Sequence, residues 1–474
     1  MATIVNTKIG VNRGRKRVFL EGRKLSCAGY KPGMMYNLSV TDNQLHIELS
    51  EAGKYKISRR KNRTNGDELP VIDITANALA ELFEESETVR VLIKQGKIVV
   101  SKHHLTENAN RREQRLLDKL ESGKPLDVCS VFHGGGILDA AMHHGFKRNN
   151  VKTKVAIAVE RESRYLESSL RNNPELWNSD SIVIESPIEL INVQRSKQTH
   201  ECDLLYASTP CTGASLSGRT KNKLKQAEDH SEAGSMFFYT LEMIVQLNPG
   251  AVLLENVPQY SSSASMSVIR SVLDSLGYTV QERIFSGLEF GALESRDRLV
   301  VVALSNGIDT FDIDKVIKGQ LYPKPDSIND ILEDVEPDSP RWKTFSYLAD
   351  KEKRDKAAGK GFARQILTGY ESCLGTIGRG YAKCRSTEPF LQHSTNNELS
   401  RILTKNEHAR VKNIPEAKVS GLSETVAHEI LGQSVIYSVF DILGMQLSSD
   451  LLTWQSKRNI QNQNLNVIPI KKCA

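Results

Sequence analysis

The chain has 474 residues, of which 39% are hydrophobic, and its formal net charge is +6. This length suffices for two or three domains with their own cores, and the composition excludes an intrinsically disordered chain. No apolar run approaches the roughly 20 residues that span a bilayer, and the N-terminal residues lack the apolar core of a signal peptide, so we expect a cytoplasmic protein with no membrane partner. The seven cysteines lack paired CxxC spacing, which indicates reduced thiols and no metal site.

Residues 1–104 are predicted to form a small, mainly β module. Short runs such as LHIEL and KIVVS alternate as strands do, and Pro-Gly and Asn-Gly pairs mark turns. The two halves look related, because GRKLSCAGY and DITANALAE each begin a short helix that leads into a hairpin. The pattern loosely resembles swapped-hairpin modules of the AbrB and SymE type, which are often DNA-binding and dimeric. That resemblance implies a DNA-binding module through which the chain forms a homodimer.

The charge of this module is uneven. The first 64 residues carry 14 Lys or Arg against four Asp or Glu. Clustered cations suit a polyanion, because phosphate contacts release counterions and supply affinity that does not depend on sequence. A solvated basic face without a partner remains the alternative interpretation.

A helical linker, residues 105–125, leads into sequence of a different kind. From Asp127 onward, apolar runs such as KVAIAV, CDLLYA, AVLLEN and LVVVAL alternate with helical segments. Buried strands separated by helices predict a mostly parallel α/β sheet with helices on both faces. Ligands of such sheets bind outside the carboxyl ends of the strands.

Two features at those ends indicate a cofactor that contains a nucleoside. The turn Phe132-His133-Gly134-Gly135-Gly136 joins a strand to a helix, and its glycines let a ligand approach the backbone. Glu160 closes the next strand, where an acid can accept hydrogen bonds from both hydroxyls of a ribose. The turn has neither Walker nor full dinucleotide spacing, so an ordinary tight turn is the alternative.

A third feature combines a thiol with a carboxyl group. Pro210-Cys211 follows the strand CDLLYA, and Glu255-Asn256 ends the strand AVLLEN. Free cysteines are usually buried, and a carboxyl group can simply cap a strand, so each residue alone has a structural explanation. Together they suggest a thiolate nucleophile beside an acid that can hydrogen-bond a heterocycle.

The order of these segments resembles that of the DNA (cytosine-5) methyltransferases. The motifs are FHGGG, a strand-ending Glu, PC, ENV, SRDR, RILTKNEHAR and GQSVIYSV, and they extend from Asp127 to Phe440. The resemblance implies a Rossmann-like, S-adenosylmethionine-dependent methyltransferase domain. It assigns residues 126–306 to the catalytic, cofactor-binding domain, 307–400 to a variable target-recognition region, and 401–474 to the return to the catalytic domain and a C-terminal tail.

The resemblance also implies which residues bind S-adenosyl-L-methionine. Glu160 would hold the ribose, Ser186 and Met236 would lie near the adenine, and Gln433 would lie near the amino-acid end. Ser186 stands where the family usually has Asp, and Gln433 stands where it commonly has Asn, which leaves open whether the donor is a modified analogue. The expected pocket residues are Phe132, Gly134, Gly136, Glu160, Ser186, Pro210, Met236, Gln433 and Ser434.

In the implied chemistry, Cys211 adds to carbon 6 of a flipped-out cytosine and makes carbon 5 nucleophilic. Glu255 would hydrogen-bond ring nitrogen 3, and Arg296 and Arg298 would bind the base or its phosphates. Glu294 stands where the family commonly has Gln, two residues before the first arginine, and the loop after the cysteine also departs at Thr212. The basic loop from Ser215 to about Gln226 is expected to close on DNA.

Double-stranded DNA is therefore the expected partner, and DNA cytosine-5 methylation is the expected activity. The basic module and the sizeable variable region favour DNA over RNA. An RNA cytosine-5 methyltransferase, and a DNA-binding regulator with a vestigial methyltransferase domain, remain alternatives.

Overall fold

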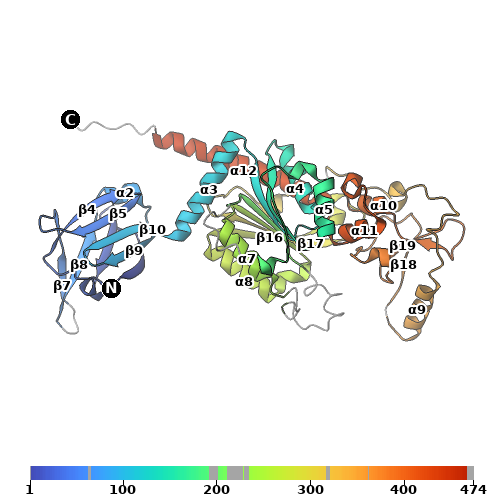
Figure 1. The fold of residues 1–474 in the computed structure, drawn as a ribbon, viewed down its shortest axis with the longest axis horizontal. Coiled ribbons are helices and arrows are strands. Elements are labelled where there is room, and N and C mark those ends of the chain that lie inside the picture. The colour runs from blue at the N-terminus through green and yellow to red at the C-terminus, as the bar shows by residue number, and fades with distance from the viewer. Residues whose placement is uncertain are drawn as a thin grey trace. The chain divides into compact units, whose positions relative to one another are not determined.

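The computed structural model describes residues 2–61, 66–191, 201–210, 228, 234–316, 321–360 and 362–466 (Figure 1). The chain divides into two compact units, Met1–Arg111 and Arg112–Ala474. Each unit has a hydrophobic core of its own.

The first unit is a module of two sheets and two short helices. The larger sheet has the strand order β1-β9-β10-β5-β4-β6, and the smaller has the order β2-β3-β8-β7. Alternate residues of the strands point into one core, as the 0% exposure of Leu45, Val91 and Ile98 shows. The strands are β1 (Thr3–Lys8), β2 (Gly10–Asn12), β3 (Arg15–Glu21), β4 (Met35–Thr41), β5 (Gln44–Leu49), β6 (Tyr55–Lys56), β7 (Ser58–Lys61), β8 (Glu68–Ile74), β9 (Thr88–Lys94) and β10 (Lys97–Lys102), and the helices are α1 (Arg23–Cys27) and α2 (Ala78–Leu82).

The two halves of this unit have the same order of elements and are intertwined. Strand β3 pairs with its counterpart β8, and β5 pairs with its counterpart β10. The outer strands are exchanged, because β1 of the first half pairs with β9 of the second, whereas β6 of the second half pairs with β4 of the first. Within one chain, each half therefore completes the sheets of the other.

The second unit carries the elements that position the candidate site. Helix α3 (His104–Ser122) begins before the boundary between the units and continues into this one. The strands are β11 (Leu126–Val131), β12 (Thr153–Glu160), β13 (Ile182–Glu185), β14 (Leu204–Ser208), β15 (Ala251–Asn256), β16 (Tyr278–Ser286), β17 (Asp297–Ser305), β18 (Gln365–Leu367), β19 (Pro389–Gln392) and β20 (Ser400–Arg401). The α-helices are α4 (Ile137–Arg148), α5 (Ser163–Asn172), α7 (Met236–Leu247), α8 (Ala264–Ser275), α9 (Ser346–Ala357), α10 (Lys405–Arg410), α11 (Glu424–Gln433) and α12 (Tyr437–Asn466). The 3-10 helices are η1 (Pro174–Leu176), η2 (Ile188–Leu190), η5 (Pro258–Ser262), η6 (Gly287–Phe290), η7 (Ile313–Lys315), η8 (Ile328–Ile331), η9 (Tyr381–Lys383) and η10 (Glu416–Val419).

The main sheet confirms the α/β, Rossmann-like prediction. Its order is β13-β12-β11-β14-β15-β17-β16, and β11 to β15 run parallel, whereas β16 and β17 are antiparallel. One core cluster joins this sheet to α3, α4 and α12, and a second joins it to α7 and α8, so helices cover both faces (Figure 1). Every residue of β15 is buried, which explains its uninterrupted apolar run.

The segment predicted as a linker, residues 105–125, contains α3 and contributes to the second unit. Arg115 donates from Nε to Oδ1 of the fully buried Asp203 at 2.9 Å. Lys119 forms an ion pair with Asp127 at 2.5 Å and another with Asp203. These charges join α3 to the beginning of β11 and to the residue before β14, so the second half of the helix is an integral part of the second unit.

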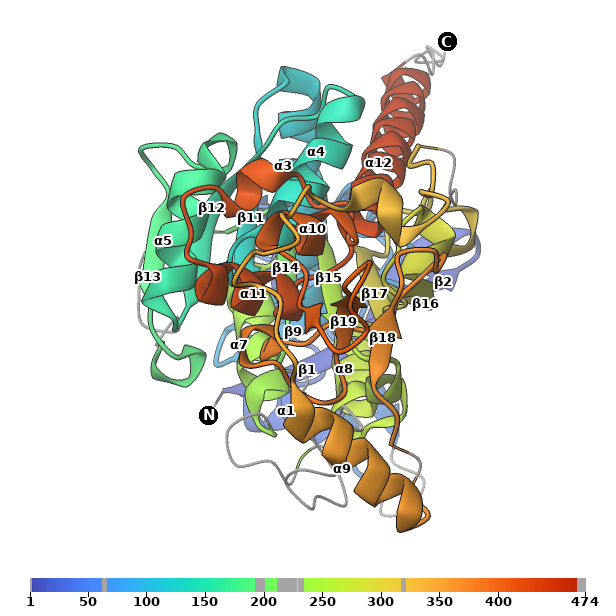
Figure 2. The same cartoon turned by 90° about the vertical axis from the view of Figure 1, so that its right-hand side faces the viewer.

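Residues 307–400 hold α9 and most of a three-stranded sheet of order β18-β19-β20. Figure 2 shows β18 and β19 side by side, with α9 below them. The return segment begins with α10, whose first turn is closed by a capping box between Thr404 and Glu407. Glu407 is fully buried and also pairs with Arg401 at 2.6 Å, which ties this segment to β20.

Among the described residues, no single helix is long and apolar enough to span a membrane. Only the pair Glu424–Gln433 and Tyr437–Gln461, bent by 50°, passes by combined length and composition.

Candidate active site at the carboxyl edge of the sheet

The glycine turn after β11 has the backbone that a close ligand contact requires. Phe132 and Gly134 both have φ near +58°, and Gly136 has φ of +72°. A Cβ on Gly136 would lie 2.3 Å from the Ser169 Oγ, so packing excludes a side chain there. A Cβ on Gly134 would meet no described atom within 4 Å. Gly134 therefore faces open space where a ligand can reach the backbone.

Glu160 lies beside this turn at the end of β12. Its side chain accepts from the backbone N–H of Gly134 at 2.7 Å and from that of Glu162 at 2.9 Å. The residue is 8% exposed, and each carboxylate oxygen keeps a lone pair for another donor. A turn open to a ligand and a fixed carboxylate at the next strand end fit a cofactor with a ribose.

Three of the other residues expected at the cofactor lie at the ends of neighbouring elements. The backbone N–H of Ser186 donates to the Glu160 carbonyl at 3.1 Å, which places Ser186 at the next strand end. Met236 begins α7, is 7% exposed and belongs to the same core cluster as Ile188 of η2, two residues after Ser186. Pro210 is exposed just after β14.

Helix α11 approaches the same turn from the C-terminal part of the chain. A Cβ on Gly135 would lie 2.5 Å from Cγ2 of Ile430, so α11 packs directly on the turn. Gln433, the last residue of α11, is exposed, and Ser434 follows it half-buried. Both residues therefore lie at the end of the helix that packs on the turn.

Glu255 and Arg298 form the second part of the site. Glu255 is the second-to-last residue of β15. It pairs with Ser208, the last residue of β14, which lies three residues before Cys211. The Arg298 Nε lies 2.8 Å from Oε1 of Glu255, and both side chains are largely buried. The predicted carboxyl group therefore stands beside a fixed guanidinium. Cys211 itself, Thr212 and the basic loop 215–226 lie outside the described residues.

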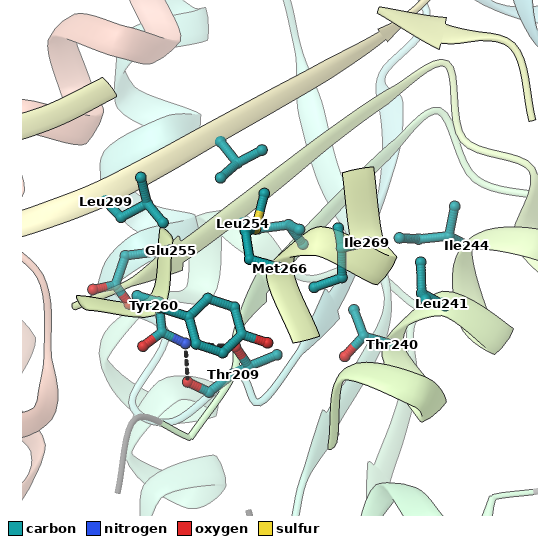
Figure 3. Close-up of a pocket in the computed structure, with 12 residues that line it drawn as sticks. Thr209, Thr240, Leu241, Ile244, Leu254, Glu255, Tyr260, Met266, Ile269 and Leu299 are labelled. Atoms are coloured by element: carbon teal, nitrogen blue, oxygen red, sulfur yellow. Dashed lines mark hydrogen bonds between the residues drawn. The ribbon is translucent and has the colours of Figure 1, made fainter. Parts of the chain in front are cut away.

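Asn256 fixes the segment that leads to Cys211. Its Nδ2 donates to Oγ1 of Thr209 at 2.8 Å and to the Thr209 carbonyl at 3.2 Å (Figure 3). Its Oδ1 accepts from the N–H of Val257 at 2.8 Å, which sets the orientation of the amide. No role for Asn256 was predicted from the sequence, although its place directly after Glu255 in the ENV triplet was a signal.

A small cavity lies behind Glu255, as Figure 3 shows. Its lining is mostly apolar and includes Leu254, Met266 and Leu299. The volume open to a water molecule is about 10 Å³, which is room for one water at most. This space belongs to the packing between the sheet and α8, and it is too small for a nucleobase.

Arg296 is placed differently from the expectation that it binds a base or phosphate. It is 4% exposed, and its guanidinium donates to Oε1 of Glu294 and to the carbonyls of Ile377 and Gly432, each at 3.3 Å. Arg296, directly before β17, therefore links the start of this strand to residues 307–400 and to α11. Arg296 cannot face solvent because residues 307–400 and α11 both pack over the start of β17.

Lys412 completes this internal cluster and was missed in the sequence. Its Nζ lies 3.2 Å from Oε2 of Glu294, and both side chains are fully buried. Burial, together with the positive charge of Arg296, lowers the pKa of Lys412 to about 7, against the opposing effect of Glu294. Glu294, which departs from the family's usual Gln, thus has a cationic partner 118 positions away in the chain.

The sheet is an open α/β sheet, and one edge carries a cofactor turn, a strand-ending carboxylate and a second carboxylate paired with an arginine. These features define a Rossmann-like methyltransferase domain. The family model for C-5 cytosine-specific DNA methylase matches residues 127–449, which is more than half of the chain. The chain therefore belongs to the C-5 cytosine-specific DNA methylase family, the enzymes that methylate carbon 5 of cytosine in DNA.

Individual relatives agree with this assignment. The Type II methyltransferase M.DsaV of Dactylococcopsis salina is 28% identical over 279 residues, which cover 57% of this chain and 75% of that protein. The Type II methyltransferase M.HhaI of Haemophilus parahaemolyticus is 24% identical over 288 residues, which cover 56% of this chain and 82% of the relative. The crystal structure of S. pombe Dnmt2 methyltransferase superposes with a TM-score of 0.54 at 21% identity, covering 70% of this chain and 99% of that one, and shows the same fold.

Proposed function

We propose that this chain methylates cytosine in double-stranded DNA through a covalent bond between Cys211 and carbon 6 of the base. The observation that supports it most is the placement of Glu255, paired with Arg298 at 2.8 Å, beside the strand end that leads into Cys211. Glu255 would hydrogen-bond ring nitrogen 3 while the Cys211 thiolate adds to carbon 6, and this addition makes carbon 5 nucleophilic. After methyl transfer, loss of the carbon 5 proton and elimination release Cys211.

The supporting residues have separate tasks. Arg298 would keep Glu255 oriented toward the base, and Asn256 would hold Thr209 so that Cys211 approaches carbon 6 from a fixed direction. Arg296 would act indirectly, by holding the start of β17 against the recognition region. A base inside a duplex hides carbons 5 and 6, so the enzyme must first extrude the cytosine.

S-adenosylmethionine is the proposed cofactor, and it supplies the methyl group when bound. Gly134 and Phe132 would line its site, Glu160 would accept from its ribose, and Ser434 would lie at its amino-acid end. Ser186, Pro210, Met236 and Gln433 would complete the pocket. The proposed location is the cytoplasm.

The homodimer expected through the N-terminal module gains no support from that module's strand pairing. In a swapped-hairpin dimer, two chains would exchange their outer strands. Here β1 and β6 are exchanged between the two halves of one chain. We therefore leave the dimer out of the proposal.

The mechanism is tested by trapping the covalent bond. Plasmid DNA substituted throughout with 5-fluorodeoxycytidine is incubated with the protein and S-adenosylmethionine, since fluorine on carbon 5 cannot leave as a proton and blocks elimination. Peptide mass spectrometry should find the DNA adduct on Cys211, and Cys211→Ser should form none. The exposed Cys27 provides the control, because Cys27→Ser should trap DNA normally. An adduct on another residue, or one formed by Cys211→Ser, would refute the proposed nucleophile.

A further inference from the structure

A cluster of buried polar side chains lies behind the glycine turn, and the proposed mechanism uses none of them. It consists of Ser130, His133, Asp139, Ser169 and Asn173, each at most 5% exposed. They come from β11, the turn, α4, α5 and the residue after α5. Buried polar groups are costly unless they are hydrogen-bonded, so the direction of each hydrogen bond in this cluster can be worked out.

The hydrogen bonds of Ser130 show where the proton of the His133 ring lies. The Ser130 hydroxyl donates its one proton to Oδ2 of Asp139 at 2.8 Å. The Nδ1 of His133 lies 2.9 Å from the Ser130 Oγ and 3.1 Å from the same Oδ2, so Nδ1 must carry a proton. In the neutral ring the other nitrogen, Nε2, is then an acceptor, and the hydroxyl of Ser169 donates to it at 2.7 Å.

The chain of hydrogen bonds continues to the backbone of the turn. Because Ser169 has given its proton to His133, its Oγ accepts from Nδ2 of Asn173 at 3.2 Å. The same amide group donates to the carbonyl of Gly135 at 3.0 Å. Each proton of the chain therefore has one place, with Asn173 at one end, Asp139 at the other, and His133 between them as both donor and acceptor.

The turn requires such support from inside. Phe132 has a φ of +58°, which a residue with a side chain rarely adopts. The backbone of the next residue, His133, is held on both sides, since its N–H donates to the Val159 carbonyl and its own carbonyl accepts from Gly136, each at 3.0 Å. A Cβ on Gly136 would lie 2.9 Å from Nε2 of His133 and 2.3 Å from the Ser169 Oγ, so the cluster packs directly against the turn.

Asp139, His133 and Ser169 have the order of a catalytic Ser-His-Asp triad, which is the alternative interpretation of this cluster. A triad works only if a substrate carbonyl reaches the serine hydroxyl. Ser169 and the side chain of His133 are both 0% exposed, and Asn173 donates to the Ser169 Oγ from the other side. The cluster therefore supports the turn and has no access to a substrate of its own.

We infer that His133 is a positioning residue for the cofactor. Through Ser169 and Asn173 it holds the inner side of the turn. In this shape the Gly134 N–H donates at 2.7 Å to Glu160, the carboxylate expected to hold the ribose. A turn that already has its bound shape loses less conformational freedom when the ligand binds, which increases affinity. The inference rests on the proposed function, because S-adenosylmethionine is the proposed ligand of this turn.

Two neighbouring serines of α5 provide a matched pair of variants. Ser168 and Ser169 are 1% and 0% exposed, but the Oγ of Ser168 has no hydrogen-bond partner among the described residues. Ser169→Ala breaks the chain between His133 and Asn173, whereas Ser168→Ala leaves it intact. Titration calorimetry of the intact protein should show a Kd for S-adenosylmethionine about tenfold higher for Ser169→Ala, the effect of about one hydrogen bond, and an unchanged Kd for Ser168→Ala.

Two substitutions at His133 separate the contacts of its two ring nitrogens. The amide of asparagine reaches the position of Nδ1 and can still meet Asp139, whereas the longer amide of glutamine reaches the position of Nε2 and can still meet Ser169. His133→Gln should therefore bind S-adenosylmethionine more tightly than His133→Asn. Equal affinities, or the reverse order, would show that the histidine does not act through Ser169 and would overturn the inference.

The shape of the turn is measured without any cofactor. Amide hydrogen exchange of residues 132–140, followed by mass spectrometry, should be faster in Ser169→Ala than in Ser168→Ala or the unchanged protein. Equal exchange in the two serine variants would refute the support of the turn, and faster exchange with an unchanged Kd would refute its role in cofactor binding. If the unchanged protein bound no S-adenosylmethionine while the exchange rates still differed, the proposed cofactor would be wrong, but the support of the turn by this cluster would be upheld.

Discussion

Replacing Lys412 by methionine removes the cation that lies 3.2 Å from Oε2 of Glu294, where both side chains are fully buried. Arg296, whose guanidinium is 3.3 Å from Oε1 of Glu294, would then be the cation that remains beside this carboxylate among the described residues. Glu294 also holds the segment around Ile377, within residues 307–400, because the N–H of Ile377 donates to Oε1 of Glu294 at 3.2 Å. The substitution therefore tests whether this pair is a structural requirement of the site.

The magnitude follows from distance and burial. Two unit charges 3.2 Å apart attract by about 5 kcal/mol at an effective dielectric constant of about 20. Desolvation of the two ions offsets most of this, so an intact pair contributes little net stability, whereas removing one partner costs about 3–5 kcal/mol. Since Arg296 still partly compensates Glu294, we expect Lys412→Met to lower the free energy of unfolding by about 3 kcal/mol.

The assay is a double-mutant cycle in urea at about pH 6, below the pKa of about 7 of Lys412, where the lysine carries its charge. Glu294→Gln and Lys412→Met are measured singly and together, and the double variant should recover most of the loss, with a coupling energy of at least about 2 kcal/mol. The ion pair Arg270–Glu282 of the same unit, with about a third of each side chain exposed, supplies the control, and Arg270→Met should cost no more than about 1 kcal/mol. Additive losses in the cycle would refute the reasoning.

Three further outcomes are expected. Lysine in an unfolded chain has a pKa of about 10.4, whereas burial lowers the pKa of Lys412 in the folded protein to about 7. Between these two values the unfolded state binds one more proton, so the free energy of unfolding should rise from pH 7 toward pH 10 by up to about 1.4 kcal/mol per pH unit. Denaturation of Lys412→Met over the same pH range should show no such rise. Gly134→Ala and Gly123→Ala both place a Cβ at positive φ in open space and should each cost about 1 kcal/mol of stability, but calorimetry should show weakened S-adenosylmethionine binding for Gly134→Ala alone. Asn256→Ala should lower kcat at least about tenfold by releasing Thr209, while Kd for DNA in a filter-binding assay stays constant; an unchanged kcat would remove Asn256 from the site.

The sheet could be predicted because its strands carry local signals. Runs such as AVLLEN are apolar throughout, and this pattern requires a strand buried on both faces. Because the carboxyl ends of parallel strands share one edge, the sequence alone predicts that Glu160, Glu255 and the glycine turn lie at the same edge of the sheet. The duplication of the first unit could also be predicted, since two short helices, each with a fully buried leucine (Leu25 and Leu79), precede equivalent hairpins.

Contacts between distant segments could not be predicted in the same way. No local pattern around Glu294 predicts its contact with Lys412, and none around Arg296 predicts its contacts with the carbonyls of Ile377 and Gly432. The partners of such buried charges depend on how the recognition region folds back on β17. For the same reason α3 looked like a linker, although Arg115 finds its partner in Asp203.

The central claim is tested most directly by the product. The protein is incubated with duplex DNA of mixed sequence, or with RNA, and with S-adenosylmethionine whose methyl group carries three deuterium atoms. Mass spectrometry of the digested nucleosides should detect trideuterated 5-methyldeoxycytidine in the DNA, absent with Cys211→Ser. Label found only in RNA, or in neither nucleic acid, would contradict the assignment of this chain as a DNA cytosine-5 methyltransferase.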